Sequence, residues 1–134
     1  MLVLCAFVFA ACNSKDDPEP TGTPATDEQY LKAICTGLVN FSDALVSKTS
    51  STEIAAVIKA YIVGMQQIQP PTDLQKFHKD FVKYLQDALN DPTSLVTTTP
   101  PLPSDDVRKR IASKERNVPE CRDATFFSTK ANPR

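Results

Sequence analysis

The chain has 134 residues, with 15 Lys and Arg against 16 Asp and Glu, and its formal net charge is -1. Because nucleic-acid-binding domains usually carry a strong basic excess, this balance argues against a nucleic-acid partner. An apolar content of 41% is enough to bury a core, and it excludes wholesale disorder. The length corresponds to one domain.

The first element is an uncharged apolar run over residues 2–11. It is about half as long as a membrane-spanning helix, and it is typical of the apolar part of a secretory signal. The run ends in Phe9-Ala10-Ala11-Cys12, which resembles the lipobox of bacterial lipoproteins. In that pattern two small residues precede a cysteine that is lipidated and becomes the new N-terminus; Phe9 stands where the pattern prefers Leu.

The resemblance implies that residues 1–11 are a signal peptide and that Cys12 carries the lipid. The mature protein would then be held in the cell envelope, on the extracytoplasmic side of a membrane. Two alternatives stay open, namely signal cleavage after Ala10 without lipidation and an uncleaved apolar anchor.

Residues 12–26 are expected to be a flexible tether between the lipidated cysteine and the domain. From residue 13 they read NSKDDPEPTGTPAT, with three Pro, several acids and no large apolar side chain. Such a segment has no apolar surface to bury and stays solvated.

The four cysteines support export of the chain. Cys5 lies in the signal peptide and Cys12 would be lipidated, which leaves Cys35 and Cys121. An even remainder in an exported protein predicts one disulfide bond. The alternative is a pair of buried free thiols.

Helical spacing of apolar residues marks the folded part, residues 27–134. Apolar residues repeat every three or four positions over 27–46, 52–68 and 73–90. A fourth, shorter helix is expected over 104–116, because Ser104 is followed by two acids and later by basic residues, which suits the helix dipole. No strand alternation is visible.

The boundaries of these helices follow from local signals. Ser or Thr three residues before Gln or Glu predicts a capping box at each of the first three helices. Gly64, within the second helix, costs about 1 kcal/mol relative to Ala and suggests a close helix–helix approach. The residues that form the three boxes are Thr26 with Gln29, Ser50 with Glu53, and Thr72 with Gln75.

Between the third and fourth helices, the proline- and threonine-rich segment 91–103 is expected to be extended. The conformation from residue 120 onward is not predicted. Short connections favour antiparallel neighbours. The sequence therefore predicts an all-α fold, a small up-down bundle of three long helices plus a shorter fourth. The end of the fourth helix would return towards the first, bringing Cys121 to Cys35.

His78 is the only histidine and the only obvious general base. Its helical phase places it within the apolar stripe of the third helix, and the Pro70-Pro71 turn brings the second helix close. A buried imidazole needs a hydrogen-bond partner, for which Tyr61 or a helix carbonyl is expected. The candidate ligand pocket consists of His78, Tyr61, Met65, Phe77 and Phe81, and the same residues also fit an ordinary core.

The sequence predicts no catalytic residue, no metal site and no cofactor. One histidine and two pairing cysteines do not supply the several ligands that a zinc or copper site needs. The basic run Arg108-Lys109-Arg110 fits contact with anionic lipid or an acidic partner, and it also fits a solvated helix face.

The first functional interpretation is a membrane-anchored binding or accessory interaction module with an unknown protein or small-molecule partner. The alternatives are a carrier of a small apolar ligand, and a hydrolase-type enzyme that uses His78.

Overall fold

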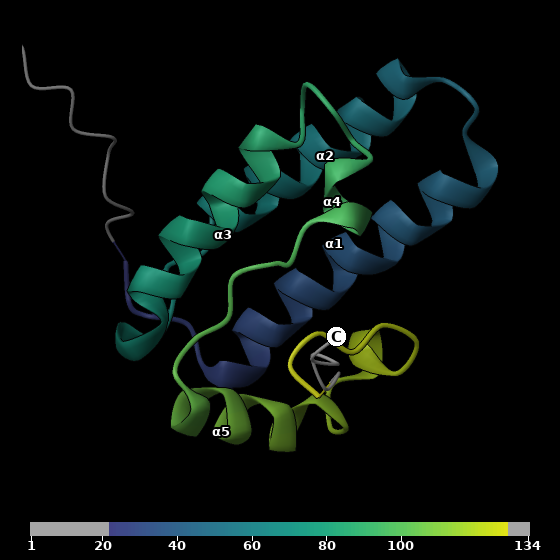
Figure 1. Ribbon diagram of the computed structural model, residues 1–134. Coiled ribbons are helices and arrows are strands. Elements are labelled where there is room, and N and C mark those ends of the chain that lie inside the picture. The colour runs from purple at the N-terminus through teal and green to yellow at the C-terminus, as the bar shows by residue number, and fades with distance from the viewer. Residues whose placement is uncertain (1–21, 129–134) are drawn as a thin grey trace, which may run out of the picture.

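The computed structural model describes residues 22–128, and all regular structure within this range is helical (Figure 1). The expected all-α fold with one disulfide bond is confirmed. The predicted signal peptide, the lipidation residue Cys12 and most of the tether lie outside the described residues. The elements are α1 (Asp27–Ser47), α2 (Ser51–Gln66), η1 (Thr72–Leu74), α3 (Gln75–Asp87), α4 (Ser94–Thr97), α5 (Asp105–Glu115) and η2 (Pro119–Cys121).

The first capping box forms as predicted. The Thr26 hydroxyl accepts from the Gln29 backbone N–H, and the Gln29 side chain accepts from the Thr26 N–H. The Ser50 side chain caps α2 by accepting from the Thr52 N–H. The third box does not form, because the chain after Pro71 first makes a 3₁₀ turn and α3 begins only at Gln75.

Three long helices run alongside one another, with α2 packed against both α1 and α3 (Figure 1). The fourth predicted helix, α5, does not run back along α1 but lies across the end of the bundle where α1 begins. The core that they share is built mainly from Tyr30, Leu31, Ile34, Phe41, Ile58, Ile62, Met65, Leu74, Phe77, Phe81, Leu85, Ile111 and Phe127.

The spacing of α1 and α2 is set by a glycine, but not by Gly64. A Cβ atom on Gly37 would lie 2.0 Å from the Tyr61 ring, so only glycine admits this side chain. The Tyr61 hydroxyl also donates to the Ile34 carbonyl oxygen at 2.7 Å. A Cβ on Gly64 would meet nothing within 4 Å, so the close approach expected there was wrong.

The segment after α3 folds back over the bundle and is not wholly extended. Residues 94–97 form the short helix α4, contrary to the extended conformation expected for 91–103. The Tyr84 hydroxyl donates to the Leu95 carbonyl oxygen at 3.0 Å and so ties α4 to α3.

The C-terminal part of the described chain is fastened to α1 and α5 at two points. The predicted disulfide is present, and it joins Cys35 on α1 to Cys121 on η2. The fully buried carboxylate of Glu115 accepts from the backbone N–H groups of Phe126, Phe127 and Ser128, at 2.6–2.8 Å. A buried carboxylate is tolerated only when it is hydrogen-bonded in this way.

No helix formed by residues 22–128 is long and apolar enough to cross a membrane.

The two glycines provide a matched test of the helix packing. Gly37→Ala is expected to destabilise the fold by roughly 1–3 kcal/mol, because the new methyl group displaces the Tyr61 ring. Gly64→Ala is expected to stabilise it by about 0.5–1 kcal/mol, because alanine is the better helix former and the site has room. Urea unfolding followed by circular dichroism measures both values; equal effects of the two substitutions would contradict this account of the α1–α2 contact.

Candidate functional site

His78 is held by Tyr30 and not by the expected Tyr61. The Tyr30 hydroxyl lies 3.0 Å from His78 Nδ1, and Tyr61 uses its own hydroxyl on α1. Burial lowers the pKa of His78 and raises the pKa of Tyr30. Both groups are therefore neutral near pH 7, and they share one hydrogen bond in which the imidazole tautomer sets which group donates. The arrangement links α1 to α3 within a packed region.

The five residues of the predicted ligand pocket do not line one cavity. Met65 and Phe77 are buried in the core, and His78 contacts Tyr30. Tyr61 and Phe81 do line a small apolar cavity of about 220 Å³ between α1, α3 and the two chain segments that cover them. The other lining residues are Leu38, Phe41, Tyr84, Leu85, Leu95, Pro100, Thr125 and Phe126.

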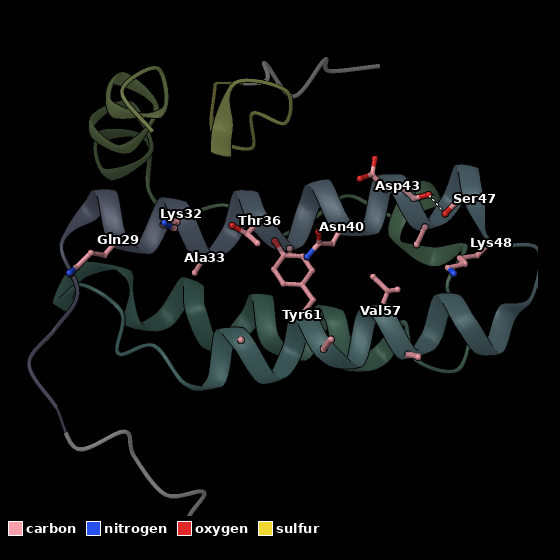
Figure 2. Close-up of a pocket in the computed structure, with 15 residues that line it drawn as sticks. Gln29, Lys32, Ala33, Thr36, Asn40, Asp43, Ser47, Lys48, Val57 and Tyr61 are labelled. Atoms are coloured by element: carbon pink, nitrogen blue, oxygen red, sulfur yellow. Dashed lines mark hydrogen bonds between the residues drawn. The ribbon is translucent and has the colours of Figure 1, made fainter. Parts of the chain in front are cut away.

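A larger hollow than this cavity lies on the outward face of α1 and α2 (Figure 2). This groove encloses about 770 Å³ and runs along the two helices. Figure 2 shows polar side chains from α1 and Lys48, the residue that follows α1, whereas α2 contributes Val57 and Tyr61. The α1 residues are Gln29, Lys32, Ala33, Thr36, Gly37, Asn40, Asp43, Ala44 and Ser47, and the α2 residues are Ala56, Val57, Ala60, Tyr61 and Gly64.

Small residues on α2 form one side of the groove. Ala56, Ala60 and Gly64 follow one another at intervals of four on the exposed side of α2, opposite the buried Ile58 and Ile62. No side chain longer than a methyl group projects from these three positions, so α2 presents a flat apolar surface. The polar side chains of α1 form the other wall, so the groove has one apolar side and one hydrogen-bonding side.

Arg110, the last residue of the basic run at positions 108–110, forms ion pairs that give it a structural role. Arg110 lies 3.0 Å from Asp27 and also pairs with Asp73, which lowers the pKa of that carboxyl. Lys114 pairs with Asp27 at 2.9 Å and with Glu28 at 3.2 Å. This cluster joins the start of α1 and the 3₁₀ turn η1 to α5. Most of these side chains are exposed and their attraction is screened by solvent, so the cluster mainly orients α5.

Within residues 22–128 no group of three or more His, Cys, Asp or Glu side chains is placed to hold a metal ion. Comparison with models of protein families, with curated proteins and with solved structures finds no match to this chain.

The groove was not predicted from the sequence, although the sequence contains a signal for it. The repeat of Ala56, Ala60 and Gly64 at intervals of four indicates a smooth helix face. That face is identified as outward only once Ile58, Ile62 and Met65 are seen to fill the core.

The Tyr30–His78 contact predicts a structural role for His78. His78→Ala should cost about 1–3 kcal/mol, since it removes packing and leaves the buried Tyr30 hydroxyl without its hydrogen-bond partner. His78→Gln, which keeps an acceptor, should cost less. Chemical denaturation of the two variants measures the difference.

The same contact predicts a pH dependence. The unfolded chain takes up a proton near the ordinary value of 6.5, whereas the folded chain resists it, so protonation favours unfolding. The free energy of unfolding of the wild type should therefore fall as the pH drops below 6.5, and more steeply than that of His78→Gln. Parallel curves for the two proteins would contradict the half-buried, neutral imidazole.

Proposed function

We propose that the chain is a lipid-anchored, extracytoplasmic recognition module that binds a partner through the α1–α2 groove. The observation that carries the recognition role is the groove itself, an open hollow of about 770 Å³ on the outward face of the two longest helices. Apolar hollows with a few hydrogen-bonding groups are the usual form of a binding site.

The anchoring part of the proposal is supported by the residues at the start of the chain. Ala10, Ala11 and Cys12 match the lipobox pattern, and a polar, proline-rich stretch separates them from the domain. The Cys35–Cys121 bond supports an extracytoplasmic location, because disulfides persist in oxidising compartments.

The position where the chain enters the domain also suits such a tether. The last described residues before α1 are pinned to the turn between α2 and α3, where the Ala25 N–H donates to the Gln69 carbonyl oxygen at 2.9 Å. The tether thus leaves from one end of the bundle, and the groove begins at Gln29, about one turn into α1.

The anchor is tested by Cys12→Ser in the full chain, with Cys5→Ser as the matched control. Cys12→Ser should lose the lipid mass and move from the membrane fraction to the soluble fraction. Stable anchoring requires more than one acyl chain. Because Cys12→Ser removes the acyl chains of Cys12, most of the protein should leave the membrane. Cys5→Ser should leave both properties unchanged. A wild-type protein that is soluble without detergent and carries no lipid would overturn the anchor.

A second candidate function, a carrier of a small apolar ligand, is favoured by the cavity of about 220 Å³ lined by Phe41, Tyr61, Phe81 and Tyr84. Its size and aromatic lining suit a single ring system such as indole.

The carrier function is tested by thermal unfolding with indole. At a free concentration 100-fold above Kd, a bound ligand stabilises a fold by about 2.7 kcal/mol. Indole should raise the Tm of the wild type and of Val96→Trp, whose side chain is 65% exposed. It should not raise the Tm of Leu95→Trp, which fills the cavity. The absence of a shift in the wild type would exclude the carrier function.

A further inference from the structure

The groove face of the α1–α2 pair is complementary to itself. On α2 the positions Ala56, Ala60 and Gly64 are spaced symmetrically about Ala60. If a second copy lies antiparallel on this face, Ala56 meets Gly64 of the second copy and Ala60 meets its own equivalent. Every contact along this line is between small residues, which allows two helix backbones to approach closely.

The α1 side of the groove has the same symmetry. Inversion of the residue order about position 38 exchanges Gln29 with Ser47, Ala33 with Asp43, and Thr36 with Asn40. The amide of Asn40 thereby faces the hydroxyl of Thr36 of the second copy, which is a hydrogen-bonding pair.

The charged side chains of α1 are also complementary under this antiparallel pairing. Lys32, next to Ala33, comes beside Asp43 of the second copy, so opposite charges meet across the contact. The Lys32 side chain is 66% exposed although it pairs with Glu120, so it is accessible to a second carboxylate. Inversion of the face onto itself places no pair of like charges opposite one another among the residues that line the groove.

The symmetry of the residues on α1 and the symmetry of those on α2 share a single rotation axis. The contact of Gly37 with Tyr61 shows that these residues lie at the same height on the antiparallel pair. Position 38 of α1 is therefore level with Ala60 of α2, and these are the two centres of symmetry. A single two-fold axis, perpendicular to the helices at this height, maps both lines of residues onto themselves, as an isologous interface requires.

We propose that the α1–α2 groove binds a second copy of this chain, in an antiparallel dimer with Ala60 on the two-fold axis. This inference rests on the proposed recognition role of the groove and names its partner. The dimer buries the apolar side of the groove on both copies and joins four long helices face to face.

The membrane anchor is compatible with this arrangement. Antiparallel pairing places the starts of the two α1 helices at opposite ends of the dimer, and a helix of 21 residues is about 31 Å long. The stretch from residue 13 to residue 24, which precedes the pinned Ala25, would reach roughly 40 Å when extended. Both tethers therefore reach the same membrane with the dimer lying flat above it.

The proposal is tested by cross-linking the full chain in membranes. Ala60→Cys places two thiols next to each other on the axis, whereas Lys59→Cys, on the neighbouring exposed position, turns its thiol away from the groove. A short bismaleimide reagent should convert Ala60→Cys to a species of twice the monomer mass, with loss of the monomer band. Lys59→Cys should stay monomeric.

Ala60→Arg completes the test, because it adds a like-charged pair at the axis on an exposed position that the fold does not use. In detergent solution the wild type should sediment as a dimer and Ala60→Arg as a monomer, with unchanged circular dichroism. A monomeric wild type, or equal cross-linking of the two cysteine variants, would overturn the proposal. Cross-linking of Ala60→Cys to a different protein would also overturn self-association, but it would leave the groove as a recognition site. The result for Cys12→Ser, which tests the anchor, is independent of all these outcomes.

Discussion

The packing of Tyr61 on Gly37 is the contact on which the rest of the structure depends. It brings α1 and α2 close together, and the Tyr61 hydroxyl fixes their relative height through the Ile34 carbonyl. Because the Tyr61 ring occupies the space between the two backbones, the small residues of α2 remain on the outside. The groove on the outward face is therefore a consequence of how the two helices are held together.

The opposite side of the bundle is completed by chain segments that are not long helices. Phe126 and Phe127 pack against Phe77 and Phe81, with ring centroids 5.2–6.1 Å apart, at separations that favour aromatic pairs. The disulfide bond and the buried Glu115 carboxylate hold this C-terminal segment in place. One side of the molecule is thus closed by covalent and hydrogen-bonded constraints, while the α1–α2 side stays open.

This asymmetry gives the proposed function a physical basis. In the proposed arrangement, a domain tethered at the start of α1 presents the open groove along α1 and α2 to a second copy. The proposed anchoring of both copies to one membrane would raise their local concentration, so a modest interface would be sufficient for pairing. His78, in contrast, belongs to the packing between α1 and α3, where it is half-buried and its Nδ1 is hydrogen-bonded to Tyr30.

Local sequence determined the helices, because apolar periodicity, the Thr26 and Ser50 caps and the Pro70-Pro71 stop act within a few residues. Counting cysteines also predicted the Cys35–Cys121 bond, since only these two were left to pair. Tertiary structure alone decided which glycine marks the close approach, that Tyr30 holds His78, and that Glu115 is buried. A carboxylate at the end of a helix opposes the helix dipole, and only the distant N–H groups of residues 126–128 explain its place there. The groove belongs with these features, because a line of small residues becomes a binding surface only when the fold leaves it facing solvent.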